Sequence, residues 1–385
     1  MEKVALLKCT DYEVESLEEK LREGFQLLGG EAFLRRLIPL NSRVLLKPNF
    51  LSSVEKGSPV ITHHAMFEAV IRIIRDYAGE IIFGDSPGSS DGRKVAERSG
   101  LLEVAERYGV SYVDFNDEVH VELENPLMYK FWNVARAPYE ADVVISLPKL
   151  KTHAMMYFTG AVKNQFGCIP GSQKAEWHTK LPDAVNFGKM LLDLNRLVGT
   201  DFAILDGIVA MEGNGPRNGT PRKMDTIIMG ESMTAVDSTA VRLIGYDNVL
   251  AIPYLKVAQE TGWGAVLPKD IEVLGERVED MVCKGFVLSR SAKMINSVSP
   301  ALNNFVASLT APDPVVIAEK CISCRKCDEV CPERPKVISF VKSGGKLIPK
   351  WNYKNCIRCF CCQELCPAGA IVIRQKKLSS LLGLR

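Results

Sequence analysis

CISCRKCDEVCP, at residues 321–332, is repeated in its spacing by CIRCFCCQELCP at residues 356–367. In each run the cysteines are separated by two, two and three residues, and a proline follows the last of them. Three thiols in one short loop can reach the same compact metal group, whereas the proline redirects the chain at the fourth. The thiols concerned are Cys321, Cys324, Cys327, Cys331, Cys356, Cys359, Cys362 and Cys366.

Zinc and disulfide bonds are the alternatives to an iron–sulfur site for a chain with many cysteines. Zinc sites often use two C-x₂-C pairs joined by a spacer. They do not require a third cysteine at the same spacing and a Cys-Pro pair, twice over. The doubled run therefore favours iron–sulfur clusters. Cys361 stands between two expected ligands, and the spacing of the first run predicts that Cys362 binds a cluster and Cys361 does not.

Residues 315–375 resemble a bacterial two-cluster ferredoxin, whose run C-x₂-C-x₂-C-x₃-C-P is the one found here twice. The resemblance implies a small α+β domain with two [4Fe-4S] clusters, in which the fourth cysteine of each run serves the other cluster. One cluster would then be held by Cys321, Cys324, Cys327 and Cys366, and the other by Cys356, Cys359, Cys362 and Cys331.

Residues 1–285 alternate short apolar runs with helical patterns, which predicts an α/β layered domain with a mostly parallel sheet. The uninterrupted apolar character of the runs suits strands covered on both faces. Residues 286–314 are expected to form a helical connector and linker, and residues 376–385 a basic tail. The expected strands are Val4–Leu7, Val44–Leu46, Ile81–Phe83, Val143–Leu147, Phe202–Leu205 and Thr226–Met229; the expected helices are Glu13–Leu28, His63–Tyr77, Leu101–Tyr108, Pro182–Val198 and Ser232–Ile244.

Polar residues follow the expected strands at their C-terminal ends, the edge of an open α/β sheet at which ligands bind. This pattern predicts one crevice that binds a small anion, a carboxylate or a phosphate, through charge-assisted hydrogen bonds. For any single residue, an ordinary loop position is the competing interpretation. The expected substrate-binding residues are Lys47, Asn49, Asp85, Lys149, Lys151, Asn164 and Asp206.

The glycine-rich stretch 159–171 carries Lys163 and Asn164 and can bring backbone N–H groups and an ammonium onto an anion. It is not a Walker A sequence, and no G-x-G-x-x-G follows a strand, so neither ATP nor a Rossmann-type nucleotide is expected. Cys168, in the same stretch, is either a reactive thiol or a buried core residue. The candidates for catalysis and proton transfer are His153, Lys163, His178 and Glu212.

Three of these stretches resemble the family of domain of unknown function 362: Leu147–His153, Thr159–Asn164 and Met211–Pro216. Lys47-Pro48-Asn49 and the turn at Asp85–Gly88 also fit the family pattern. Members often carry a C-terminal pair of ferredoxin-type clusters. The resemblance, with a distant fold relation to the nickel-pincer lactate racemases, implies an architecture and no particular reaction.

Composition excludes several classes of function. The chain has 385 residues and a net charge of +2, which gives no electrostatic reason to expect nucleic acid or a membrane surface as a partner. No apolar run is long enough to span a bilayer, and the N-terminus lacks the apolar core of a signal peptide. Eight thiols reserved for metal suit a reducing compartment. We therefore expect a cytoplasmic protein.

Two functions are compatible with this sequence. The first is an enzyme, a ferredoxin-linked oxidoreductase that passes electrons between a redox partner protein, such as a ferredoxin or a reductase, and a small anionic substrate in the crevice. The second is a non-catalytic electron carrier whose α/β domain docks a redox partner or senses a ligand. Convergence of the lysines on one crevice favours the enzyme.

Overall fold

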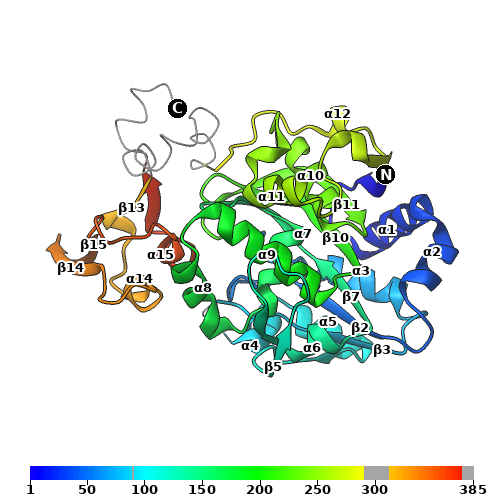
Figure 1. Cartoon of the computed structure of the whole chain (residues 1–385), viewed down its shortest axis with the longest axis horizontal. Coiled ribbons are helices and arrows are strands. Elements are labelled where there is room, and N and C mark those ends of the chain that lie inside the picture. The colour runs from blue at the N-terminus through cyan, green and yellow to red at the C-terminus, as the bar shows by residue number, and fades with distance from the viewer. Residues whose placement is uncertain (89–90, 290–311, 375–385) are drawn as a thin grey trace.

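The computed structural model describes residues 1–88, 91–289 and 312–374 (Figure 1). The connector expected over residues 286–314 therefore lies largely outside the described residues, and the expected basic tail lies outside them entirely. Among the described residues, no helix has the length and apolar character that crossing a membrane requires.

The larger part of the chain is built on one mixed sheet in the order β12-β1-β11-β10-β7-β2-β3-β4, with β8 and β9 extending from β10. Most neighbouring pairs are parallel, and the antiparallel pairs are β1 with β11, β10 with β11, and β8 with β9. The strands are β1 Glu2–Lys8, β2 Arg43–Pro48, β3 Glu80–Phe83, β4 Ser111–Tyr112, β7 Val143–Leu147, β8 Lys149–His153, β9 Tyr157–Thr159, β10 Phe202–Glu212, β11 Thr220–Gly230 and β12 Ile271–Gly275.

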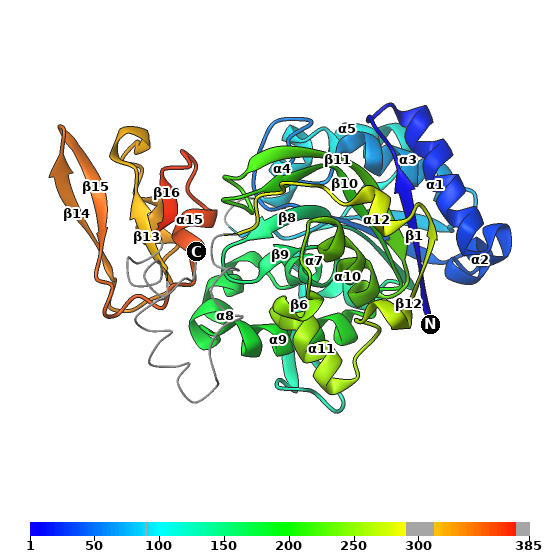
Figure 2. The same ribbon diagram turned by 90° about the horizontal axis from the view of Figure 1, so that it is seen from above.

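A hydrophobic core lies on each face of the sheet. One strand contributes to both cores, because its successive side chains point to opposite faces. Along β1, Val4 and Leu6 belong to one hydrophobic core, and Ala5 and Leu7 to the other. Figure 2 shows α1, α3 and α5 on one side of the sheet and α9, α10 and α11 on the other. The helices of the first side are α1 Val14–Leu28, α2 Gly30–Leu37, α3 His64–Ile74, α4 Gly92–Arg98 and α5 Leu101–Tyr108; those of the second are α6 Arg136–Glu140, α9 Ala184–Val198, α10 Met233–Leu243, α11 Pro253–Thr261 and α12 Val278–Met281. A hairpin of β5 Glu118–Glu122 and β6 Phe131–Ala135 stands apart from the sheet.

The α/β layered fold predicted from the sequence is confirmed, and each expected strand lies within an observed one. Two expected loops are instead strands. The segment Lys149–His153 forms β8, and β10 continues past Leu205 as far as Glu212. Both segments contain polar residues, so their sequences lack the apolar pattern by which the other strands were recognised. They pair with each other beyond the main body of the sheet.

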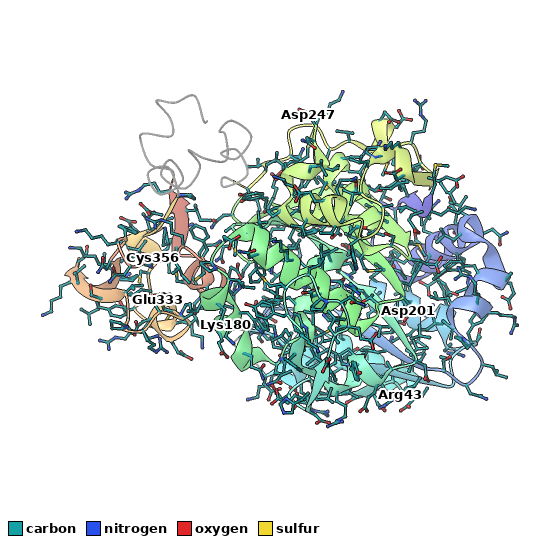
Figure 3. The ribbon with its side chains drawn as sticks, viewed as in Figure 1. Arg43, Lys180, Asp201, Asp247, Glu333 and Cys356 are labelled. Carbon is teal, nitrogen blue, oxygen red and sulfur yellow. The ribbon has the colours of Figure 1, made fainter. Side chains whose placement is uncertain are left out.

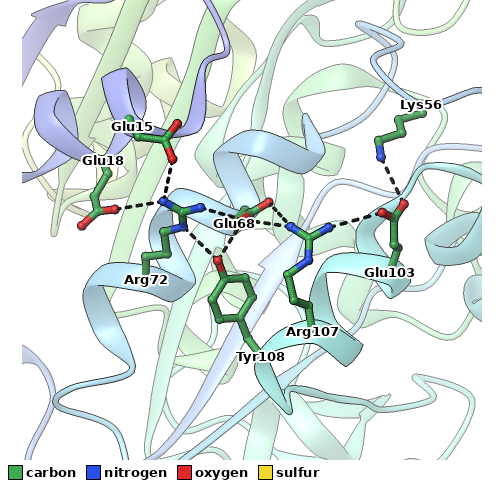
Figure 4. A network of polar contacts seen from close by, with 8 residues as sticks. All are labelled: Glu15, Glu18, Lys56, Glu68, Arg72, Glu103, Arg107 and Tyr108. Atoms are coloured by element: carbon green, nitrogen blue, oxygen red, sulfur yellow. Dashed lines mark hydrogen bonds and ion pairs between the residues drawn. The ribbon is translucent and has the colours of Figure 1, made fainter.

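A polar cluster on the outer surface fastens α3 to α5 (Figure 4). The buried carboxylate of Glu68 on α3 accepts hydrogen bonds from Arg107 and Tyr108 on α5 and from Arg72 on its own helix. Arg72 also reaches Glu15 on α1, at 3.1 Å. Because Glu68 is almost fully buried and multiply bonded, it holds the two helices together more firmly than an exposed ion pair would.

The smaller part of the chain contains the two cysteine runs. Its strands are β13 Asp313–Val316, β14 Ile338–Ser343, β15 Lys346–Trp351 and β16 Ile371–Arg374, and its helices are α14 Lys326–Glu329 and α15 Cys361–Glu364. Each helix follows a residue with positive φ, Arg325 before α14 and Phe360 before α15. The same local geometry therefore occurs twice. Gly344 and Gly345, both with positive φ, make the turn between β14 and β15.

The two parts contact each other through α15. Gln363 donates from Nε2 to the backbone oxygen of Asn214, at 3.0 Å, and its own backbone oxygen accepts from Nδ2 of Asn218, at 2.9 Å. Gln363 is fully buried in this contact. The helix that carries Cys362 is therefore seated on the loop that joins β10 to β11.

Asp237 on α10 fixes the start of α7 Ala161–Asn164, the short helix that carries Lys163. Its carboxylate accepts from the backbone N–H of Ala161 at 2.6 Å and of Val162 at 3.0 Å, and from the hydroxyl of Tyr254 at 2.9 Å. A Cβ on Gly160 would lie 2.1 Å from the carboxylate oxygen, so only glycine allows this approach.

Asp237→Ala should lower the free energy of unfolding by about 2–4 kcal/mol, because it strands two backbone N–H groups and a hydroxyl in the interior. Asp183, an exposed N-cap that accepts from the N–H of Asn186 on α9, provides the control. Its replacement by alanine should cost about 1 kcal/mol. Anaerobic urea unfolding measures both; an equal or smaller loss for Asp237→Ala would contradict the assigned role.

Candidate functional site

Lys47, at the end of β2, is completely buried and paired with Asp85, which follows β3. Its Nζ lies 2.8 Å from Oδ1 of Asp85 and donates to the backbone oxygen of Asn164 at 2.7 Å. The other carboxylate oxygen of Asp85 accepts from the N–H of Phe50. The pair is thus neutral and links two strand ends to the glycine-rich segment.

Lys151, Asn49 and Asn164 continue this network. Nζ of Lys151 donates to Oδ1 of Asn49 at 2.6 Å and to the backbone oxygen of Val60 at 2.7 Å. Nδ2 of Asn49 donates to Oδ1 of Asn164 at 3.1 Å. Burial, and to a smaller extent the nearby ammonium of Lys163, lowers the pKa of Lys151 to about 7.

Lys149 and Asp206 form a second ion pair, at 2.7 Å, from opposed positions on β8 and β10. The hydroxyl of Tyr12 donates to Asp206 and accepts from Lys149. Burial lowers the pKa of Lys149, against the opposing effect of Asp206. This pair does not line the cavity described next, so the expected lysines are divided between two buried networks.

A cavity of about 300 Å³ opens between the two parts of the chain. Its α/β wall includes five residues expected from the sequence to form the site: Asn49, Asp85, Lys163, Asn164 and His178. Sequence reasoning missed the opposite wall, because residues far along the chain supply it. The lining residues are Asn49, Phe50, Leu51, Asp85, Ser86, Gly88, Lys163, Asn164, Phe166, Gly167, Gly171, Lys174, Ala175, His178, Lys326, Glu329, Val330, Cys361, Glu364 and Leu365.

Lys163 and Lys174 are the two cavity cations that have no carboxylate partner among the described residues. Nζ of Lys163 lies 5.2 Å from the ring centroid of Phe166. Lys174, on α8 Lys174–Lys180, donates to the backbone oxygen of Ile169. Burial lowers the pKa of both groups, that of Lys174 to about 7. Lys174 was not among the residues expected from the sequence.

His178 is buried against Phe187, with stacked rings 4.8 Å apart, and its Nδ1 has no hydrogen-bond partner. Burial lowers the pKa of His178 to about 4; Glu364 opposes this effect, and Lys163 adds to it. The ring is therefore neutral at neutral pH. The ring forms part of the cavity lining.

His153 lies behind the cavity wall and contacts Glu364 on α15. Its Nδ1 accepts from the N–H groups of Met155 and Met156, which puts the proton of a neutral ring on Nε2. Nε2 lies 2.7 Å from Oε1 of Glu364, so the two side chains form an ion pair whenever the ring is protonated. Burial raises the pKa of Glu364, whereas His153, Lys163 and His178 lower it. The lowering effect is the larger, and the pKa of Glu364 is about 2.

Glu212 and Cys168 lie outside the cavity lining. Glu212 accepts from the N–H of Val287 at 2.9 Å and lies 4.0 Å from Arg222. Cys168 is fully buried with its Sγ 3.5 Å from Oε1 of Gln165, and burial raises its pKa to about 12. These surroundings are those of structural residues.

The cysteines of the smaller part line two separate hollows. One is lined by Cys321, Cys324, Cys327 and Cys366. The other is lined by Cys331, Cys356, Cys359 and Cys362. Each set combines three cysteines of one run with the last of the other, and all-thiolate donors suit an iron–sulfur cluster. Among the described residues, no three or more His, Cys, Asp or Glu side chains are grouped to hold a single metal ion.

The lowered pKa of His178 makes stability depend on pH. The folded protein binds fewer protons than the unfolded chain between pH 6.5 and about 4, so stability is lost as the pH falls through this range. Between pH 7.5 and 5.5 the loss attributable to His178 should be about 1 kcal/mol. In anaerobic urea unfolding, His178→Phe should remove that part of the loss. Replacing the exposed His120 by phenylalanine should leave it intact, and equal behaviour of the two variants would contradict the assignment.

Comparisons with known proteins agree with these two parts. Residues 44–242 match the family described as "Domain of unknown function (DUF362)", and residues 320–370 match a 4Fe-4S dicluster domain. Two solved structures resemble the fold at a low level: the lactate racemase apoprotein of Thermoanaerobacterium thermosaccharolyticum (TM-score 0.38, 10% identity, 60% of this chain and 54% of that chain) and a protein of Thermotoga maritima (TM-score 0.34, 12% identity, 54% and 53%). The chain thus spans about half the length of each of these structures.

A curated relative is more similar in sequence. It is the "Thylakoid-associated protein sll1697" of Synechocystis sp. (strain ATCC 27184 / PCC 6803 / Kazusa), 35% identical over 260 residues that make up 67% of this chain and 79% of the relative. Together, the match over residues 44–242, the match over residues 320–370 and this relative identify the chain as an iron–sulfur protein that belongs to the DUF362 family and carries a 4Fe-4S dicluster domain.

Proposed function

We propose that the protein is an iron–sulfur oxidoreductase that passes electrons between an external carrier and a small anionic substrate held in the cavity between its two parts. One observation carries the proposal. The helix α15 supplies Cys361 and Glu364 to the cavity wall, and in the same turn it supplies Cys362 to one of the cysteine-lined hollows. A molecule in the cavity would therefore lie next to a cluster.

The cavity residues support distinct roles. Lys163 and Lys174 would bind the anion, since neither has a carboxylate partner. The neutral ring of His178, which lines the cavity, would exchange a proton with the substrate. Lys47 and Asp85 would hold the floor rigid rather than bind the substrate, because they neutralise each other. Lys149, Lys151 and Asp206 would act in the same structural way.

Two [4Fe-4S] clusters with crossed ligands form part of this proposal, supported by the composition of the two hollows. Cys361 would not be a ligand, since it lines the larger cavity and neither of the two hollows. When bound, the clusters supply single electrons. The chain's own residues on α15 would hold one cluster beside the substrate.

The external carrier would be a redox partner protein that docks at the outer cysteine loop. Cys324 is exposed there, and Ile322 beside it is 61% exposed. Two cations lie beside this loop: Arg325 lies over the ring of Phe340, and Lys346 donates to the backbone oxygen of Cys321. An exposed apolar residue next to these two cations suits an electron-transfer protein with an acidic docking surface.

The anaerobically purified protein should contain about eight iron and eight sulfide per chain. Cys362→Ser should remove iron from one cluster, whereas Cys361→Ser should retain the wild-type content. Elemental analysis and the visible absorbance of the clusters measure both. Zinc in place of iron after reconstitution would contradict the clusters, and iron loss only in Cys361→Ser would reverse the assignment of the two thiols.

The redox reaction is tested with protein whose clusters have been reduced anaerobically. A panel of small carboxylic acids and organic phosphates should include at least one compound that reoxidises the clusters, seen as recovery of their absorbance. Lys163→Gln should slow that reaction about ten-fold or more, the loss expected for a hydrogen bond to a charged group.

Lys180, exposed on α8 and labelled in Figure 3, provides the matched control, and Lys180→Gln should react like the wild type. If the clusters stay reduced with every compound but transfer electrons to a carrier protein, the chain is an electron carrier and not an enzyme.

A further inference from the structure

Trp351, the last residue of β15, carries an indole N–H that has no hydrogen-bond partner among the described residues. The side chain is only 6% exposed, so water does not take the place of a partner. Buried polar atoms are nearly always hydrogen-bonded, because an unpaired donor in the interior destabilises the fold. A buried donor of this kind indicates that the protein holds an acceptor there.

The indole lines one of the two cysteine hollows, the one that contains Cys331, Cys356, Cys359 and Cys362. Burial raises the pKa of the Cys362 thiol, and the nearby indole N–H opposes that rise. The N–H thus lies near this sulfur, although the neutral thiol does not accept a hydrogen bond from it. A thiolate is a stronger acceptor because it is ionised, so a cluster-bound thiolate would supply the missing partner.

The other hollow has no comparable donor. Val316 stands as far before the first cysteine run as Trp351 stands before the second, and it lines that other hollow. Its side chain has no polar atom. The two polar side chains in the same lining are engaged elsewhere, since Ser323 donates to a backbone oxygen and Arg325 lies over an aromatic ring. The two hollows therefore differ in one buried indole N–H.

Resting on the two clusters of the proposed function, we infer that the indole N–H of Trp351 donates a hydrogen bond to the Cys362 thiolate and raises the reduction potential of the cluster in that hollow. Reduction adds one electron, whose charge is shared with the sulfur ligands, so a donor at a sulfur stabilises the reduced state more than the oxidised one. Burial acts in the opposite direction, because it disfavours added charge. The proton stays on the indole nitrogen throughout.

The places of the two hollows show what this donor does for the proposed reaction. The hollow without it contains the exposed Cys324, at the loop where the redox partner would dock. The hollow with it adjoins the α/β part, since Phe360 in its wall packs with Ala154. Trp351 would therefore shift the distribution of an electron between the two hollows toward the inner one.

Anaerobic redox titration of the full-length protein with its clusters, followed by electron paramagnetic resonance, tests the inference. Trp351→Phe keeps an aromatic ring and removes the N–H. It should shift the reduction equilibrium of one cluster about ten-fold toward the oxidised form, which for a single electron is a fall of about 59 mV, and leave the other cluster unchanged. Ile338→Val removes one methylene group but no donor from the same hollow, and it should leave both potentials unchanged.

The sign of the shift separates the hydrogen bond from a packing role. A loosened hollow would admit water, which stabilises the added charge and raises the potential. An unchanged or raised potential in Trp351→Phe, with its iron retained, would overturn the inference.

The wild type gives a second readout should Trp351→Phe lose iron. Trp351 is the one tryptophan between residues 312 and 374. Protein labelled with ¹⁵N in its indole rings should show hyperfine coupling of one ¹⁵N nucleus to a reduced cluster, and absence of this coupling would contradict the hydrogen bond. A wild type without iron would refute the proposed clusters as well. The expected potentials, without reoxidation by any compound of the panel, would refute the proposed redox function alone.

Discussion

A buried ammonium group must find a partner, and the arrangement of this site depends on how Lys47 satisfies that requirement. An unpaired charge in the interior costs several kcal/mol, so Lys47 at the end of β2 is stable only with Asp85 beside it and the backbone oxygen of Asn164 above it. These contacts join three segments that are distant in the sequence. Glycine is required at position 167 for this close approach, because a Cβ there would lie 1.8 Å from the carboxylate of Asp85. The floor of the cavity is thereby fixed before any ligand arrives.

Lysines that lie at the same edge of the sheet do not all belong to the same binding site. Lys47, Lys149 and Lys151 all follow or lie in strands near that edge, as their positions after apolar runs indicated. Each of them bonds to a buried partner within the α/β part: Lys47 to Asp85, Lys149 to Asp206, and Lys151 to Asn49. Of the lysines expected from the sequence, Lys163 alone lines the cavity without a carboxylate partner among the described residues, because the short helix α7 brings it to the wall.

Much of the architecture could be predicted from the sequence because it depends on local signals. The apolar runs that became β2, β7 and the first half of β10 were recognisable from composition, and the cysteine spacing identified the smaller domain. Polar strands were missed: β8 contains Lys149, Lys151 and His153, whose burial depends on tertiary partners that no local pattern reveals. The wall formed by Cys361, Glu364 and Leu365 was missed for the same reason, since it exists only when α15 packs on the α/β part.

The seating of α15 through Gln363 has a consequence for how such proteins diversify. A single helical turn supplies a thiol to a cysteine-lined hollow and side chains to the cavity, so the two cannot vary separately. Grafting the dicluster domain of another family member onto this chain would transplant half of the pocket along with the redox centre. The ligand preference of such a chimera should therefore depend on both parent proteins. Recombination at the boundary between the two parts should preserve the contact only if Asn214 and Asn218 are exchanged together with Gln363.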